Sequence, residues 1–486
     1  MPNIGWLLIV LGGYIAIVLA IGYYGYKNTK ATPEDYYLGS RSLGTLVLAG
    51  TMIATYASLW TFLGAVGGNY RVGISFVSMM LLWNLTWPLM IWIVGTRVWI
   101  LGKKYGYITY SELISDYYDS KWLGIIASIF GILALLPYIA VQLMGGGVAI
   151  EAYTNGAISF PLGVIIMFVF MVLVISLAGV KSVVLTDTLQ GIFFLSVMLG
   201  IAFYAVHLCG GFGSLFDRLS ASKSDLIIPG KMGFGIWIGY VFTWGFAVVL
   251  PHMFQRLMMS KDPRTIAKTT IASSILSGWF QTIPVFILGI ACVVLIPGLQ
   301  GKATDSIAIL FSTKFLSPSI AALVVGGAFA AGTSTLNSQL LTTSSMVVRD
   351  LIQNSQEKKI PPKKETYYGK LTVLFLGIIV LVIALFRPGL IVPISTAGTA
   401  ICISSYVYPL IGVLFWPRAG KVAAYSSMMV AGVVSIATWL VWEFPLGIYN
   451  VLWGLIIGGI TFVIVSLITK PLAREKRIKF YDIVNY

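Results

Sequence analysis

The sequence predicts an all-α membrane protein that crosses a lipid bilayer about thirteen times. Of its 486 residues, 58% are hydrophobic and only 10% are charged, whereas soluble domains carry about 25% charged residues. Apolar runs of about 20 residues, the length that spans the hydrocarbon core as a helix, recur along the chain. Such runs must be helical because each segment has to satisfy its own backbone hydrogen bonds in lipid.

Short loops separate the expected spans. We therefore expect one transmembrane domain over residues 1–470 and a tail at 471–486. The first run has Lys27 and Lys30 after it and no positive residue before it, which favours a retained first helix with an external N-terminus. The expected spans lie near residues 5–25, 44–67, 74–101, 121–148, 159–179, 185–208, 234–258, 267–296, 316–348, 368–386, 390–416, 422–442 and 448–469.

Positive charge is divided unevenly between the two predicted sides of the membrane. With an external N-terminus, the cytoplasmic segments hold 24 of the 32 Lys and Arg residues and the external segments hold 7. This bias follows the positive-inside rule and predicts a cytoplasmic C-terminus. It also accounts for the net charge of +15 without a nucleic-acid partner. In this count Arg256, Lys261 and Arg264 form a cytoplasmic anchor at the tail of the seventh span.

Signatures of enzymes are missing from the sequence. It has no P-loop, no GxSxG motif and no cluster with the spacing of metal ligands. Cys209, Cys292 and Cys402 lie far apart in or beside apolar segments, where buried small side chains are expected. We expect no enzymatic activity.

The ninth span carries a polar face. Ala331, Ser334, Thr335 and Ser338 lie at i, i+3, i+4 and i+7, so they share one side of a helix. Small and hydroxylated residues in this pattern fit close helix packing. They also fit a site for a hard cation, which prefers oxygen ligands. The stripe alone leaves both interpretations open.

The second and seventh spans have features of interrupted helices. The stretch from Ala54 to Thr61 is small and polar, and an unwound segment there would free the carbonyls of Ala54 and Ala57. Transporters place ions and substrates at such breaks in mid-membrane. In the seventh span, Gly245 and Pro251 can interrupt the helix.

Two further positions carry polar groups at membrane depth. Asp187 lies just inside the sixth span, where a carboxylate indicates function unless it is a helix-start acid stabilised by the helix dipole. Tyr138 and Gln142 lie at i and i+4 on the fourth span. Both could face a polar cavity, or Gln142 could bond to a neighbouring helix.

Four segments, in this order, resemble landmarks of the sodium:solute symporter family. They are DYYLGSRSLG (35–44), KSVVLTDTLQG (181–191), LPHMFQR (250–256) and TSTLNSQL (333–340). The resemblance covers nearly the whole chain and is closest to the pantothenate and proline branches. It implies a LeuT-type core in which helices 2–6, about 44–208, and helices 7–11, about 234–416, are inverted five-helix repeats.

The resemblance also implies roles for individual residues. Sodium would be bound at Ala54, Ala57, Ala331, Ser334 and Thr335. A possible second cation site would use Asp187, Ser334, Asn337 and Ser338, although Asn337 departs from the usual hydroxyl residue. The substrate would be lined by Tyr56, Thr61, Tyr138, Gln142, Tyr240 and Trp244.

We therefore expect a sodium-coupled symporter in the plasma membrane that imports a small organic solute by alternating access. Na⁺ is the coupling ion, and neither another cofactor nor an obligatory protein partner is expected. The solute is a monocarboxylate, pantothenate, proline or another amino acid. Thr61 and Met80 stand where sugar-transporting members have glutamine and glutamate, so a sugar is not expected. The alternative is a proton-coupled transporter of the same fold, with Asp187 as the proton carrier.

Overall fold

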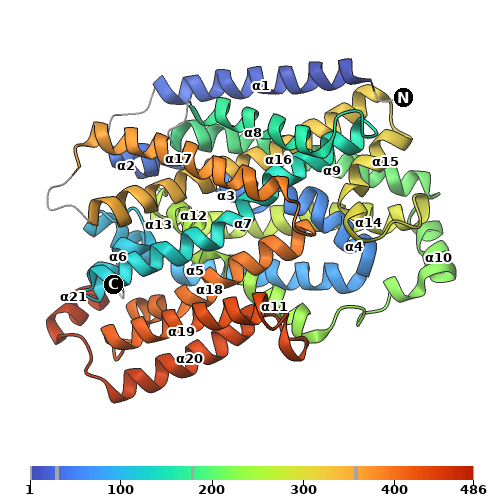
Figure 1. Cartoon of the computed structure of the whole chain (residues 1–486). Coiled ribbons are helices and arrows are strands. Elements are labelled where there is room, and N and C mark those ends of the chain that lie inside the picture. Colours follow the sequence, from blue (N-terminus) through green and yellow to red (C-terminus); the bar gives the residue numbers. More distant parts are fainter. Residues whose placement is uncertain (1–2, 28–31, 177–179, 355–359, 485–486) are drawn as a thin grey trace.

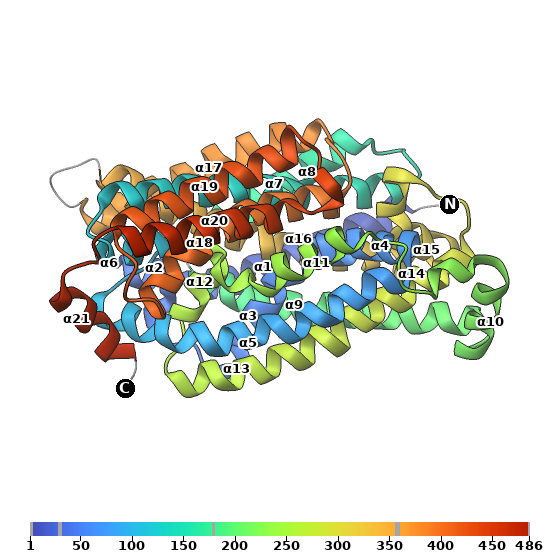
Figure 2. The same ribbon diagram turned by 90° about the horizontal axis from the view of Figure 1, so that it is seen from below.

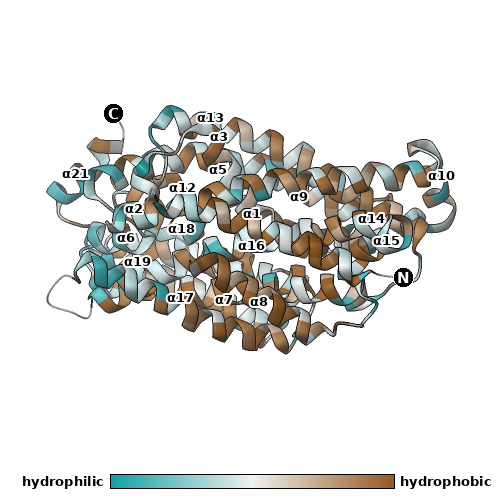
Figure 3. Cartoon of the chain, turned by 90° about the horizontal axis from the view of Figure 1, so that it is seen from above, coloured by the Kyte–Doolittle hydropathy of each residue, from teal (hydrophilic) through white to brown (hydrophobic). Residues whose placement is uncertain are grey.

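The computed structural model describes residues 3–27, 32–176, 180–354 and 360–484. Long helices run side by side through the bundle, and the N- and C-termini lie at opposite ends of it (Figures 1 and 2). Hydrophobic residues dominate the middle of the bundle and hydrophilic residues gather at its two ends (Figure 3). This distribution is that of a membrane protein whose ends lie in water.

Each expected span has a helical counterpart. Within the described residues, ten helices are long and apolar enough to cross a membrane, and one bent pair brings the number to eleven. The bent pair consists of α3 (Thr45–Tyr56) and the π-helical η2 (Trp60–Ala65) continued by α4 (Val66–Val72). The ten are α1 (Ile4–Lys27), α5 (Ile74–Tyr105), α7 (Lys121–Tyr153), α9 (Val180–Leu208), α13–η5–α14 (Pro263–Leu295), α16–η7 (Pro318–Gln353), α17 (Pro362–Leu385), α18 (Ile391–Leu414), α19 (Lys421–Leu440) and α20 (Asn450–Ile468).

The two remaining expected spans are not long unbroken helices. The span expected near 159–179 is the 17-residue helix α8 (Phe160–Ser176). The span near 234–258 is divided into α11 (Phe234–Gly245), η4 (Ala247–Val249) and α12 (Pro251–Met258). The predicted interruption at Gly245 and Pro251 is confirmed, since α11 ends at Gly245 and α12 begins at Pro251. Proline fits the first turn of a helix but interrupts a helix interior.

Short helices connect the spans. Thr109 caps the first turn of α6, and Glu112 completes a capping box there. The connecting helices are α2 (Pro33–Leu38), η1 (Gly39–Arg41), α6 (Tyr110–Tyr117), α10 (Phe212–Lys223), η3 (Ser224–Leu226), η6 (Gly301–Ser306), α15 (Ile307–Phe315) and η8 (Pro445–Gly447), and α21 (Arg474–Val484) follows the last span.

Helix α16 forms the centre of the bundle. Every residue from Val324 to Met346 is buried, and the helix packs against α3, α7, α9 and α17. In contrast, α1 lies at one edge of the bundle and α19 and α20 lie at the opposite edge (Figure 1). The hydroxyl-rich segment therefore faces protein on all sides rather than lipid. The division of the spans into two inverted repeats stays a prediction.

At the end of the molecule that holds α10 and α15, a buried carboxylate joins three elements. Asp305 of η6 has a side chain only 3% exposed, and its Oδ1 lies 3.8 Å from the Arg71 guanidinium of α4. Its Oδ2 accepts a hydrogen bond of 3.0 Å from the backbone N–H of Ile391, at the start of α18. Burial raises the pKa of Asp305 to about 6.

We expect this carboxylate to make stability depend on pH. An acid whose pKa is higher in the folded state than in the unfolded state destabilises the fold above that pKa, and the penalty disappears as the acid is protonated. Wild type should therefore gain roughly 1–3 kcal/mol relative to Asp305→Asn as the pH falls from 7.5 to 4. Thermal unfolding of both proteins across this range measures the difference, and parallel pH profiles would contradict it.

Candidate ion and substrate site

Helix α3 ends in the middle of the expected second span. Ala57 follows it in an extended conformation, with φ −87° and ψ 99°, and the chain becomes helical again at Trp60. The two parts of the span are bent by 58°. The predicted break between Ala54 and Thr61 is therefore confirmed, although no proline or glycine causes it. The C-terminal carbonyls of α3, which carry the negative end of its dipole, point into the break.

Hydroxyls of α16 meet these carbonyls. Ser334 Oγ donates to the Ala54 carbonyl oxygen at 2.8 Å, and Thr335 Oγ1 donates to the Thr55 carbonyl oxygen at 3.1 Å. Both hydroxyls also lie within hydrogen-bond distance of the Ala331 carbonyl, at 3.1 and 3.3 Å. Neutral oxygens from two helices thus converge at the broken end of α3, and they are the ligand type that a hard monovalent cation prefers.

Helix α7 supports the break from the other side. Gln142 Oε1 accepts the backbone N–H of Leu59 at 3.1 Å, an amide that follows the unwound residues. The hydroxyls of Tyr138 and Ser58 form a hydrogen bond of 3.3 Å. Gln142 is fully buried, so the interpretation in which it bonds to a neighbouring helix is the one that the structure supports. The Gln142 side chain thus accepts a hydrogen bond from the Leu59 amide, which the broken helix leaves without a backbone partner.

Asp187 and Arg256 form a buried ion pair. Asp187 lies two turns inside α9 and is fully buried, which excludes a helix-start acid. Arg256 Nη2 donates to Asp187 Oδ2 at 3.0 Å, and Arg256 Nε donates to Thr51 Oγ1 at 3.2 Å. Thr51 in turn donates to Asp187 Oδ2 at 2.8 Å. The expectation of Arg256 as a cytoplasmic anchor is wrong, because its side chain is only 2% exposed and neutralises a carboxylate.

The residues of the possible second cation site lie close to this pair. Ser338 donates to Asp187 Oδ2 at 3.0 Å and also contacts Arg256. Asn337 is buried, and neither atom of its amide has a hydrogen-bond partner among the described residues. Arg256 and Ser338 both bond to Asp187 Oδ2, whereas Asp187 Oδ1 is buried and has no hydrogen-bond partner among the described residues.

Aromatic side chains gather next to the break. Tyr56 stacks on Trp87 of α5 with ring centroids 4.3 Å apart, and its hydroxyl donates to the Trp244 carbonyl at 3.3 Å. The Trp244 ring lies 5.2 Å from Trp60 and 5.7 Å from Tyr138. This aromatic cluster brings together Tyr56, Tyr138 and Trp244, three of the predicted substrate-lining residues. It has no charged side chain among its members.

Two predicted substrate-lining residues have other contacts. Tyr240 packs on Tyr449 of α20 with ring centroids 4.7 Å apart. Thr61 Oγ1 accepts a hydrogen bond of 3.0 Å from Gln281 Nε2, in the π-helical η5. Neither contact is with the aromatic cluster, so the structure does not bring the whole predicted set together.

Comparison with known proteins identifies the family of this chain. A model of the sodium:solute symporter family matches residues 36–431, which is most of the chain. The chain belongs to the sodium:solute symporter family. The resemblance carried by the four motifs is thereby confirmed, and with it the prediction of a sodium-coupled solute symporter.

Two curated relatives of this family member match over most of both chains. The sodium/pantothenate symporter of Escherichia coli is 27% identical and covers 88% of this chain and 89% of its own length. The sodium/proline symporter of Staphylococcus aureus is 26% identical and covers 95% and 92%. Both are transporters, which agrees with the absence of enzyme motifs in the sequence.

A solved structure shows the same fold. A substrate-bound, outward-open structure of a Na⁺-coupled sialic acid symporter matches this family member with a TM-score of 0.82 at 18% identity. The match covers 96% of this chain and 98% of that chain. The predicted all-α membrane fold with a LeuT-type core is confirmed.

Several residues around the site were not predicted from the sequence of this symporter. Thr51 and Thr55 lie one turn apart on α3, and both donate to Asp187. Their i, i+4 spacing on a span was a usable signal. Trp83 joins the aromatic cluster 5.4 Å from Trp60, but a tryptophan in a membrane helix has no sequence feature that separates it from a lipid-facing one.

Proposed function

We propose that this chain imports a small organic solute together with Na⁺, and that Na⁺ binds between the broken end of α3 and the hydroxyl face of α16. The observation that carries the proposal is the contact of Ser334 and Thr335 with the carbonyls of Ala54 and Thr55. The proposed ligands are the carbonyls of Ala54, Ala57 and Ala331 and the hydroxyls of Ser334 and Thr335.

An arriving Na⁺ replaces hydroxyl protons as the partner of the carbonyls. Each hydroxyl then rotates its proton away and presents a lone pair to the ion. Because the ion contacts both α3 and α16, it stabilises the conformation in which the two helices are close together. Neutral ligands bind Na⁺ more weakly than a carboxylate cage does, which favours release on the other side.

The driving force comes from the membrane potential and the sodium gradient. One positive charge that enters a cell gains about 2.3 kcal/mol per 100 mV of inside-negative potential. We place the N-terminus outside and the C-terminus in the cytoplasm, in the plasma membrane. The positive-inside bias of the loops supports this orientation, and moving Arg256 from the loops to the interior leaves the bias in place.

The solute site that we propose lies at the aromatic cluster, next to the sodium ligands. Its members are uncharged and combine apolar faces with hydroxyl and indole donors. A small monocarboxylate or an amino-acid-like zwitterion fits such a lining. Tyr56 would link the two sites, because it belongs to the cluster and immediately precedes Ala57 in the chain.

The rival is coupling to protons through Asp187. The ion pair with Arg256 argues against it, since a protonated Asp187 would leave the guanidinium buried without a counter-charge. Uptake of labelled carboxylates and amino acids into proteoliposomes, with Na⁺ replaced by choline at constant pH, tests the proposal. We expect uptake to fall to the passive level without Na⁺. Unchanged uptake that responds to a pH gradient would establish the rival.

A further inference from the structure

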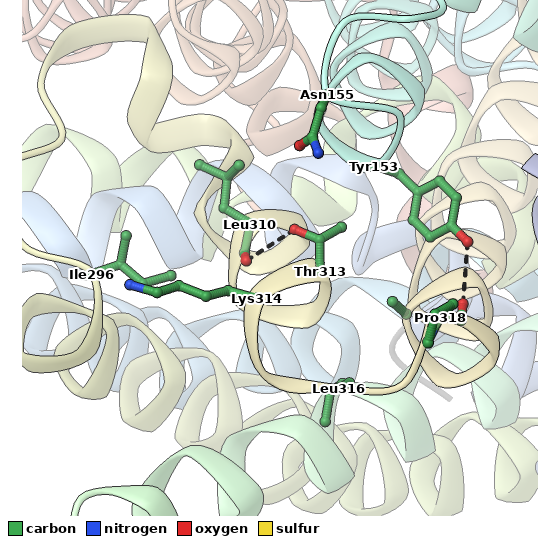
Figure 4. Close-up of a pocket in the computed structure, with 9 residues that line it drawn as sticks. Tyr153, Asn155, Ile296, Leu310, Thr313, Lys314, Leu316 and Pro318 are labelled. Atoms are coloured by element: carbon green, nitrogen blue, oxygen red, sulfur yellow. Dashed lines mark hydrogen bonds between the residues drawn. The ribbon is translucent and has the colours of Figure 1, made fainter. Parts of the chain in front are cut away.

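Three cavities follow one another from the end of the molecule that holds α15 towards its middle. The first, of about 470 Å³, has a mixed lining in which Tyr153, Asn155 and Lys314 stand beside apolar residues (Figure 4). It shares Leu316 with a second cavity of about 430 Å³ between α9 and α16. The second shares Leu323 with a third of about 440 Å³ between α1, α9 and α16. These volumes lie in the range of ligand sites, about 300–1,000 Å³.

The second and third cavities are apolar and follow one face of α9. Their α9 linings run from Tyr204 and Gly200 through Val197 to Phe193 and Leu189, in steps of three or four residues. This is the spacing of a single helical stripe. No charged residue lines either cavity. The two form an elongated groove at membrane depth, where hydrocarbon is the surrounding solvent.

Glycines keep this groove open. A Cβ atom built on Gly13 of α1 or on Gly200 of α9 meets nothing within 4 Å, and both residues line the groove. Glycine in membrane helices usually permits close packing of a neighbouring helix. Gly67 and Gly289 behave in that way, with contacts below 3 Å. Gly13 and Gly200 do not, so packing within the chain does not explain them.

The first cavity adjoins a basic side chain. Lys314 is exposed, and its ammonium donates to the Leu295 carbonyl at 3.5 Å and lies 5.3 Å from the ring centroid of Phe315, which lines the neighbouring apolar cavity. Figure 4 shows the Lys314 side chain extending toward Ile296 and away from Tyr153. An ammonium and the amide of Asn155 in a cavity that adjoins an apolar groove are complementary to a phosphate that carries an acyl chain.

We propose that this chain binds one anionic phospholipid, with its phosphate at Lys314 and Asn155 and an acyl chain along α9 between α1 and α16. The acyl chain contacts the two helices that carry Asp187 and Ser334. It also lies beside Tyr14, whose hydroxyl bonds to Thr333 Oγ1 at 2.7 Å, one residue before Ser334. The lipid therefore fills a gap between the peripheral α1 and the helices of the proposed ion site.

The test uses the full-length chain in vesicles of phosphatidylethanolamine and phosphatidylglycerol. A phosphatidylglycerol with a photoreactive diazirine on its acyl chain should label peptides of α9 and α16, and excess unlabelled phosphatidylglycerol should suppress the labelling. Gly200→Leu and Gly13→Leu fill the groove and should abolish the labelling. Gly12→Leu is the matched control, since Gly12 also has open space around it but does not line the groove.

A second pair of variants tests the headgroup. Lys314→Gln should weaken binding roughly fivefold, the effect of one basic residue near a headgroup. Lys302→Gln should not, because Lys302 is an exposed lysine that also bonds to a backbone carbonyl, that of Arg387, but lines none of these cavities. Labelling that excess lipid does not suppress, or that is equal in groove and control variants, would overturn the proposal. So would cross-linking of a second copy of the chain at Gly13. If Gly200→Leu fails to assemble, two other measurements test the proposal. They are the suppression of wild-type labelling by excess unlabelled lipid and the comparison of Lys314→Gln with Lys302→Gln.

Discussion

Arg256→Gln is expected to destabilise the folded protein by about 3–5 kcal/mol, the usual result of removing one partner from a buried ion pair. Asp187 would keep its negative charge in the interior, with the hydroxyls of Thr51, Thr55 and Ser338 as its remaining donors among the described residues. The variant should lose both thermal stability and uptake. Thermal unfolding in detergent measures the first effect, and solute uptake in proteoliposomes measures the second.

Two further variants isolate the role of charge. Arg256→Gln combined with Asp187→Asn removes both charges and should recover most of the stability, because no unpaired charge remains. Lys261→Gln alters an exposed residue near the same end of α12 and should change stability by less than about 0.5 kcal/mol. An Arg256→Gln protein that unfolds at the wild-type temperature would contradict the ion pair.

Ser334→Ala and Thr335→Ala are each expected to raise the sodium concentration for half-maximal uptake by about 10- to 100-fold. A hydrogen-bonding partner of a charged group is worth about 1.5–3 kcal/mol, and 1.4 kcal/mol corresponds to a factor of ten. The maximal rate at saturating Na⁺ should change less than the half-saturating concentration. Uptake measured over a range of Na⁺ at constant ionic strength gives both quantities.

Thr343→Ala is the matched control for these variants. Thr343 is a buried residue on the same helix, and its hydroxyl donates to the Gln339 carbonyl of that helix at 2.7 Å. Its loss should leave the sodium dependence of uptake unchanged. If Ser334→Ala and Thr335→Ala both behave like Thr343→Ala, Na⁺ does not bind between α3 and α16.

Local composition predicted the helices and the position of both interruptions. The length of an apolar run can be read from the sequence of that segment alone. The spans could therefore be predicted without knowledge of their neighbours. The same holds for Pro251, whose ring starts a helix wherever it occurs. The break after Tyr56 was predicted from small and polar residues, and the structure adds what stabilises it, namely Gln142 on a helix more than 80 residues away in sequence.

Partners across the bundle were harder to predict. Arg256 lies at the very end of the expected seventh span, and a basic residue at that place usually faces the cytoplasm. Only the short α12, which begins at Pro251, keeps it inside the protein opposite Asp187. Tyr240 is a second case, since its ring packs on Tyr449 of a distant helix, a contact that no local pattern in the sequence indicates. Both outcomes depend on how helices rotate against each other.

The bond from Leu59 to Gln142 has a consequence for how tightly an ion can bind. It ties the backbone next to the unwound residues to α7. Ordering a free backbone costs about 1–2 kcal/mol per residue at room temperature, and a preorganised receptor avoids that loss when its ligand arrives. The entropy cost of ordering the backbone at the break therefore falls on folding. Ion binding does not carry this cost, so the carbonyls contribute more fully to the affinity for a cation.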